Sequence, residues 1–466
     1  EISLCDWSSD VCSSDLHIPD KKNKALEKPP KKEIWGYGIG SLGLNSSFTL
    51  TSSFLTYYYT DSAGITAGAV GTLMLIARLF DGITDIAMGT VVDKTNTKHG
   101  KTRPWILWMS LPLGLAILSL FTVPDISNSG KLVYAYVTYL AFILFYTMVA
   151  IPYKTLLAMM TQDQHSRSLS NLNSAIWFMF GTLIVMTLTQ PIAANFGWTT
   201  LAIAYAIVTV IPLFITYRAV KERVTTPPGK ENTIPFKLSI RALAKNQYWF
   251  LITIVCVLFY IILSLVQGGG LYYARWVLEN ENFFPLIGLA LTGPMVLGLF
   301  FMGPLVKKFG KKNVMILGWF VALIGQCIKM IDMDDLPTFL IGSALAGLGA
   351  MPSLGLMVAI LNDTVEYGEY KTGVRTEGLL NSGASFGGKV GTGLGLAIIG
   401  WLLSYGGYVG QATAQNEVAI TMIKYINIHL PIVFGILLVL LLFFFKVEKQ
   451  YPEIIAELQR RKNVNQ

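Results

Sequence analysis

The segment IARLFDGITDIAMG, residues Ile76–Gly89, places three charged side chains inside a long apolar stretch. Arg78, Asp81 and Asp85 are spaced three and four residues apart, so they share one face if the segment is a helix. The surrounding stretch Ala67–Val92 is long enough to cross a bilayer, which needs about 20 residues. A charge at bilayer depth costs roughly 3 to more than 10 kcal/mol, so it faces a cavity or the interior of a bundle. The segment therefore predicts a transmembrane helix whose charges have a function.

The whole chain has the composition of a polytopic membrane protein. Of its 466 residues, 53% are hydrophobic and 14% are charged, with a mean hydropathy of +0.53. A soluble domain carries about 25% charged residues, so one large soluble core is excluded. The apolar runs do not alternate as the strands of an outer-membrane barrel do. We predict an all-α polytopic membrane protein.

Twelve apolar runs define the predicted organisation as two six-helix halves, which is the layout of the major facilitator fold. Residues Glu1–Leu16 lack an initiator methionine and contain the near-repeat SSDVCSSD, so we expect them to be foreign to the folded protein. The predicted parts are a leader with a basic arm (1–34), a first bundle (35–217), a cytoplasmic loop (218–247), a second bundle (248–446) and a cytoplasmic tail (447–466). The predicted spans are Trp35–Tyr59, Ala67–Val92, Trp105–Val123, Val133–Tyr153, Leu172–Ala194, Thr199–Tyr217, Tyr248–Tyr273, Phe284–Val306, Val314–Ile331, Thr338–Leu361, Leu379–Ser404 and Ile426–Phe445.

The net charge of +8 follows from basic loops rather than from a nucleic-acid partner. KTNTKHGKTR after the second span and KKFGKK after the eighth fall on the same side as the central loop and the tail. Basic loops mark the cytoplasmic side, so we expect an integral inner-membrane protein with both termini in the cytoplasm. The four cysteines have no metal-ligand spacing.

The intramembrane charges suggest a cation site. Asp81 and Asp85 offer up to four hard oxygen atoms, which suit a small hard cation or a proton. Arg78 could instead form a structural ion pair with Asp81. Lys389, in GASFGGKVGTGLG, lies mid-span in the second half, where it could balance an aspartate or extend toward the membrane surface. Thr147 could add a hydroxyl oxygen to a cation shell or bond to its own helix.

Other candidates lie near the cytoplasmic ends of helices. Tyr146 and Tyr153 could stack on a sugar ring, although aromatic residues in helices more often pack. Lys154 could reach a cavity or mark the end of its helix. Asp363 and Arg375, in DTVEYGEYKTGVRTEG, could form salt bridges of an inner gate or belong to a solvated loop.

Four segments resemble the glycoside–pentoside–hexuronide:cation symporters, a family that includes melibiose permease and glucuronide permease. They are YYYTD, GTLMLIARLFDGITDIAMGTVVDKTNTKHGKTRPWIL, YTMVAIPY and DTVEYGEYKTGVRTEG. The resemblance implies a major facilitator fold and uptake of a sugar derivative with Na⁺, Li⁺ or H⁺. It assigns Asp81, Asp85 and Thr147 to the cation site, which is a metal site if the cation is Na⁺. It places Lys389 near both the cation site and the sugar site. It assigns Asp363 and Arg375 to a cytoplasmic gate.

The resemblance is weaker at the sugar site. The aspartate that holds sugar hydroxyls in melibiose permease is Ala150 here, and a nearby tryptophan is Lys154. Asn45 replaces an aspartate and is a weaker anchor for sugar hydroxyls. A lysine suits a carboxylate, so we expect a sugar acid such as a glucuronide rather than a neutral galactoside. The predicted substrate residues are Asn45, Tyr146, Tyr153, Lys154 and Lys389.

The sequence thus predicts a monomeric cation-coupled symporter of sugars or sugar acids that needs no cofactor and works by alternating access. One alternative is a carrier of lipids or other amphiphiles on the same scaffold. A membrane enzyme is disfavoured, because the four histidines lie near ends or loops and show no serine–histidine or metal cluster.

Overall fold

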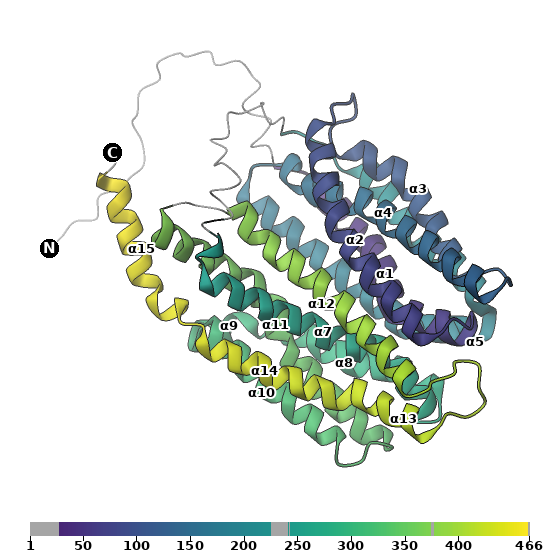
Figure 1. Cartoon of the computed structure of the whole chain (residues 1–466). Helices are drawn as coiled ribbons and strands as arrows, with labels where there is room; N and C mark the ends of the chain where they lie inside the picture. The colour runs from purple at the N-terminus through teal and green to yellow at the C-terminus, as the bar shows by residue number, and fades with distance from the viewer. Residues whose placement is uncertain (1–27, 225–240, 242, 374–376, 465–466) are drawn as a thin grey trace.

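The computed structural model describes residues 28–224, 241, 243–373 and 377–464. Within them the chain is helical, and the single β-contact is an isolated bridge between Thr97 and Gly100. Figure 1 shows long helices in two groups, α1–α5 in purple to blue and α7–α14 in teal to yellow. The prediction of an all-α protein is confirmed.

The first group begins with α1, which packs along α5, while α3 lies against α4 and α5. Gly197 divides α5 into two helices, because its φ of 81° lies in the left-handed region that breaks an α-helix. The elements of this group are α1 (Lys31–Tyr57), the π-helical turn η1 (Tyr58–Ser62), α2 (Ala67–Lys94), α3 (Arg103–Leu120), α4 (Asn128–Met160) and α5 (Gln164–Ala219).

The second group is built around α11, which packs against α8 and α10, and around α7, which packs against α12 and α14. Its elements are α7 (Gln247–Trp276), η2 (Glu281–Phe283), α8 (Phe284–Leu299), α9 (Met302–Phe309), α10 (Lys311–Lys329), α11 (Leu336–Thr372), α12 (Glu377–Tyr405), α13 (Glu417–Lys424), η3 (Tyr425–His429), α14 (Leu430–Phe444) and α15 (Val447–Val464).

The described helices account for the predicted membrane spans. Nine of them are long and apolar enough to cross a membrane. The helix α5 contains two spans, and α1 and α2 complete the predicted twelve although they are less apolar. Their polarity has a clear origin, because α1 buries many serine and threonine side chains and α2 contains the internal charges.

Several helix ends differ from the predicted ranges. The span expected to end at Tyr153, just after Pro152, continues as a helix to Met160. Packing within a bundle tolerates the loss of the one backbone hydrogen bond that this proline removes. The span expected at Phe284–Val306 is interrupted between α8 and α9. The tail contains the helix α15, which the sequence analysis did not predict.

The two groups of helices contact each other where α2 meets α12, α5 meets α8 and α1 meets α7. At the end of α1 an ion cluster joins them. Asp61 of η1 accepts hydrogen bonds from Arg275 (3.0 Å) and Tyr408 (2.7 Å), and Arg275 also pairs with Glu281 at 3.2 Å. We call Asp61, Arg275 and Glu281 the end cluster.

Candidate functional site

A cavity of about 330 Å³ lies between the two groups of helices. Helices α1, α2, α4 and α5 line it on one side, and α7, α8, α11 and α12 line it on the other. Its wall contains charged, amide and hydroxyl groups together with aromatic rings, so the cavity can hold a polar solute. The predicted residues on this wall are Asn45, Arg78, Asp81, Tyr146, Lys154 and Lys389.

Glycines of α12 determine how closely its charged residue approaches the other helices. A Cβ atom at Gly391 would lie 2.5 Å from the carbonyl oxygen of Val257 on α7. A Cβ atom at Gly393 would lie 2.8 Å from Cβ of Arg78 on α2. Only glycine therefore allows α12 to lie this close to both neighbours, and this contact places Lys389 against α2.

Lys389 binds both aspartates of α2. Its Nζ lies 2.9 Å from Oδ1 of Asp81 and 2.5 Å from Oδ2 of Asp85. It also donates a hydrogen bond of 2.9 Å to the backbone carbonyl of Asp81. Thr147 of α4 completes the group by donating to Oδ1 of Asp81 (3.0 Å) and to Oδ1 of Asp85 (3.3 Å). We call Asp81, Asp85, Thr147 and Lys389 the central cluster.

Arg78 is held mainly by groups outside the central cluster. Its Nη2 donates to Oγ of Ser52 at 2.9 Å, and its guanidinium lies 4.6 Å from the ring centroid of Phe48. The shortest distance to a carboxylate oxygen of Asp81 is 3.8 Å. Arg78 is 3% exposed, so its charge remains buried next to the cluster. The two cations and two carboxylates make this region neutral.

The central cluster has the groups that a small cation needs, with an ammonium already in place. The Nζ of Lys389 lies between the two carboxylates, whose oxygens are of the kind that bind a sodium ion or a proton. Among the described residues there is no group of three or more His, Cys, Asp and Glu side chains that could hold a metal ion. A metal here would therefore depend on the two carboxylates, hydroxyl or carbonyl oxygens and water.

The predicted substrate residues separate into two sets. Tyr146 and Lys154 line the cavity, where Tyr146 is half-buried and Lys154 is exposed. Asn45 also lines it, but its amide already donates to the carbonyl of Phe178 (2.6 Å) and to Oγ1 of Thr182 (2.7 Å). Asn45 thus joins α1 to α5, which leaves its remaining capacity for a ligand small.

Tyr153 does not reach the cavity. Its hydroxyl donates to the backbone carbonyl of Tyr37 at 2.6 Å, and the two rings stack with centroids 4.7 Å apart. It is 5% exposed. The structure therefore gives Tyr153 the packing role that the sequence analysis considered as the alternative to sugar stacking.

Uncharged polar residues on the cavity wall escaped the sequence analysis. Gln267 of α7, in LSLVQGGG, had a weak signal as an amide within an apolar run. Serine and threonine residues had no such signal, because these side chains are common in helices where they bond to their own backbone. The additional wall residues are Thr49, Thr182, Thr292, Ser385 and Thr392.

The predicted gate residue Asp363 does not line the cavity. Asp363 accepts hydrogen bonds of 2.7 and 2.6 Å from Nζ of Lys311, the first residue of α10. This pair joins α11 to α10 within the second group of helices. Arg375 lies outside the described residues, so its part in an inner gate stays a prediction.

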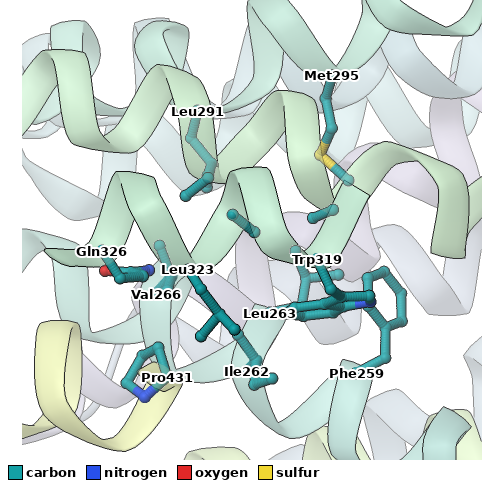
Figure 2. Close-up of a pocket in the computed structure, with 13 residues that line it drawn as sticks. Phe259, Ile262, Leu263, Val266, Leu291, Met295, Trp319, Leu323, Gln326 and Pro431 are labelled. Carbon is teal, nitrogen blue, oxygen red and sulfur yellow. The ribbon is translucent and has the colours of Figure 1, made fainter. Parts of the chain in front are cut away.

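A much smaller space, of about 30 Å³, lies within the second group of helices. Figure 2 shows side chains that line it, among them Trp319 and Met295. Leu263 and Met295 line both this space and the central cavity. Its wall is apolar apart from Gln326 and Trp319, and the Trp319 indole donates to Ser353. A sugar, which needs many hydrogen-bond partners, fits the central cavity and not this space.

Comparison with known proteins gives one family. The family model described as MFS/sugar transport protein matches residues 36–449. The isoprimeverose transporter of Lactiplantibacillus pentosus is 33% identical over 445 residues, covering 93% of this chain and 92% of that protein. The glucuronide carrier protein homolog of Escherichia coli strain K12 is 32% identical over 459 residues, covering 93% of this chain and 97% of that protein.

Solved structures agree on the fold. The crystal structure of a bacterial homolog to human lysosomal transporter, Spinster, in inward-facing and unoccupied conformation, superposes with a TM-score of 0.65. It is 11% identical in sequence, and the match covers 91% of this chain and 98% of that one. At this identity the likeness concerns the fold alone, and it supports the major facilitator architecture predicted from the sequence.

Proposed function

The chain belongs to the MFS/sugar transport protein family, and from this premise we propose that it is a cation-coupled symporter of a glycoside, pentoside or hexuronide. It is a membrane transporter of sugars and not an enzyme. The observation that carries the coupling proposal is the position of Lys389, whose ammonium binds Asp81 and Asp85 at the wall of the cavity.

The coupling step is an exchange of cations on the aspartates. Na⁺, Li⁺ or H⁺ enters between Asp81 and Asp85 and displaces the ammonium of Lys389. Two separate cations cannot share this position, because like charges a few ångströms apart repel strongly in a medium of low dielectric constant. The displaced ammonium then moves within the cavity that its side chain already lines.

The exchange links the cation to the substrate. Once Lys389 has left the aspartates, it and Lys154 present two ammonium groups to the cavity. A carboxylate on a sugar ring accepts charge-assisted hydrogen bonds from such groups. Each ligand then raises the affinity for the other, since linkage between two binding sites is reciprocal. On this basis a hexuronide such as a glucuronide is the substrate class that the wall favours.

Transport follows from rocking of the two groups of helices around the cavity, which lies where they meet. We place the protein in the cytoplasmic membrane with both termini inside, because its basic loops fall on that side of the predicted topology. The proposed working unit is the monomer, because one chain supplies both walls of the cavity.

Uptake into proteoliposomes tests the proposal directly. We expect uptake of a glucuronide to be driven by a Na⁺ or a proton gradient, applied one at a time. Asp81→Asn should abolish the stimulation by the cation, because it removes half of the negative charge that binds it. Asp93→Asn, an exposed change near the end of the same helix, is the matched control and should keep it.

Two outcomes would overturn the proposal. Unchanged cation stimulation in Asp81→Asn would remove the aspartates from the coupling step. Tight lipid binding together with no competition by any glycoside would favour the alternative, a carrier of amphiphiles.

A further inference from the structure

A groove on the second group of helices has no part in the proposed sugar transport. It has a volume of about 330 Å³ between α9, α10 and α11. Every residue on its wall is apolar or glycine. The members that the argument uses are Phe309, Leu317, Gly318, Val321, Leu348 and Gly349.

Glycines bring α10 and α11 together in the groove. A Cβ atom at Gly318 would lie 2.6 Å from the carbonyl oxygen of Gly349 and 2.7 Å from the ring of Pro352, so the two backbones approach closely beside that ring. Larger side chains form the rims, and Leu317 and Leu348 are 49% and 41% exposed. From Val314 to Val321 the groove follows α10 for about 10 Å at 1.5 Å per residue. This shape accommodates an extended hydrocarbon chain.

Two lysines stand at one end of the groove. Lys307 and Lys308 are exposed in the last turn of α9, and Nζ of Lys308 lies 5.2 Å from the ring centroid of Phe309, which lines the groove. The acidic groups nearby are already engaged. Asp363 binds Lys311, and Glu448 accepts hydrogen bonds from the backbone amides of Lys311 and Lys312. The end of the groove is therefore positively charged.

We propose that this groove, together with Lys307 and Lys308, is a binding site for one anionic phospholipid. An acyl chain lies along α10 beside Gly318 and Gly349, and the phosphate meets the two ammonium groups where α9 ends. The site complements such a lipid in two ways. Its apolar side chains suit an acyl chain, and the basic cluster at the helix end suits the anionic headgroup. The site lies on the outer surface of one helix group, so its lipid is distinct from the transported solute.

Native mass spectrometry of the full chain in detergent tests the headgroup. Phosphatidylglycerol and phosphatidylethanolamine with identical acyl chains are titrated in parallel, and phosphatidylglycerol should bind more tightly. The double variant Lys307→Gln/Lys308→Gln should weaken its binding about thirtyfold, as expected for two lysines at a lipid surface. The matched control Lys94→Gln/Lys98→Gln changes two exposed lysines at and just after the end of α2 and should leave binding within about threefold.

A second pair of variants tests the groove itself. Val321→Trp fills it and should prevent tight binding, whereas Val433→Trp, at a 57% exposed position of α14, should not. Equal binding of the two lipids, equal effects of the two lysine pairs, or unchanged binding in Val321→Trp would each overturn the proposal. Inorganic phosphate added to the wild-type protein should not displace the lipid, and displacement would assign the site to free phosphate instead.

Discussion

The central cluster and the end cluster both join the two groups of helices through ion pairs, but they differ in what can replace the cation. In the central cluster Lys389 contacts two carboxylates beside a cavity, so an entering cation can take its place. In the end cluster Arg275 contacts aromatic groups, although 29% of its side chain remains exposed. It donates to the hydroxyl of Tyr57 at 2.6 Å, and its guanidinium lies 4.8 Å from the ring centroid of Trp276.

This difference separates two tasks of an alternating-access carrier. A cation site must exchange its bound cation in every transport cycle. An ion cluster that holds the two groups of helices together must instead form and break as a unit. The planar guanidinium suits the second task, because it holds several acceptors in a fixed geometry. A flexible lysine suits the first. We therefore expect variants in the central cluster to change ion dependence, and variants in the end cluster to change the balance between open and closed conformations.

The largest effect is expected for Lys389→Met. Removing the ammonium leaves Asp81 and Asp85 without their cation, and breaking one partner of a buried pair costs about 3–5 kcal/mol. Uptake should be lost. The melting temperature in choline chloride should fall, and Na⁺ should restore more of it than it adds to the wild-type protein. Lys98→Met, an exposed control, should show neither effect. A variant whose melting temperature responds neither to Na⁺ or Li⁺ nor to pH would contradict the proposed cation exchange.

A smaller effect is expected from pH at the end cluster. Burial, opposed in part by hydrogen bonds from Thr60 and Tyr408, raises the pKa of Asp61 from 3.8 to about 6. An open conformation that hydrates this carboxyl should return its pKa toward 3.8. The closed conformation then binds the proton more tightly. At low pH this favours the closed conformation, and the preference is lost as pH rises through about 6. Between pH 4 and 6 the equilibrium constant between the open and closed conformations changes by up to about tenfold per pH unit.

Label distances can measure this shift. Probes at Ser129 and Asp332, which are exposed at this end of the two groups, should report more of the open conformation as pH rises. In Asp61→Asn the dependence between pH 4 and 6 should disappear. Persistence of the same dependence in that variant would assign it to another group.

The smallest effect is expected for Arg275→Lys. The charge is kept, but a lysine cannot reach Asp61, Glu281 and Tyr57 in the geometry of the guanidinium. The same label pair should show about a tenfold shift toward the open conformation, as the loss of one charge-assisted hydrogen bond predicts. Lys131→Gln breaks a pair with the fully exposed Asp125 and should change little. If Arg275→Lys and Lys131→Gln shift the equilibrium between the open and closed conformations equally, the end cluster contributes no more than an ordinary surface ion pair.

Much of the fold and part of the site could be predicted from the sequence. The span positions follow from apolar length, and the meeting of Asp81, Asp85 and Lys389 follows from the cost of leaving buried charges unpaired. The role of Tyr153 could not be predicted, because a tyrosine contacts a ligand or a neighbouring helix equally well by composition. Its contact with Tyr37 depends on how α1 and α4 pack.

The end cluster also lacked a sequence signal. Asp61 and Arg275 are far apart in the chain and lie near helix ends, where charges are common. The helix α15 was missed for a related reason. Its residues are mostly polar, and its position is fixed by specific contacts such as that of Glu448 with the first residues of α10. Such contacts depend on tertiary structure rather than on local periodicity.

The neutrality of Arg78, Asp81, Asp85 and Lys389 has an electrical consequence. An unloaded carrier that returns with this balanced set moves no net charge through the membrane field. If one monovalent cation enters with a neutral sugar, each cycle moves one positive charge, worth about 2.3 kcal/mol per 100 mV. If the same cation enters with a sugar carboxylate, the two charges cancel. Whether uptake generates a current would then reveal the charge of the sugar.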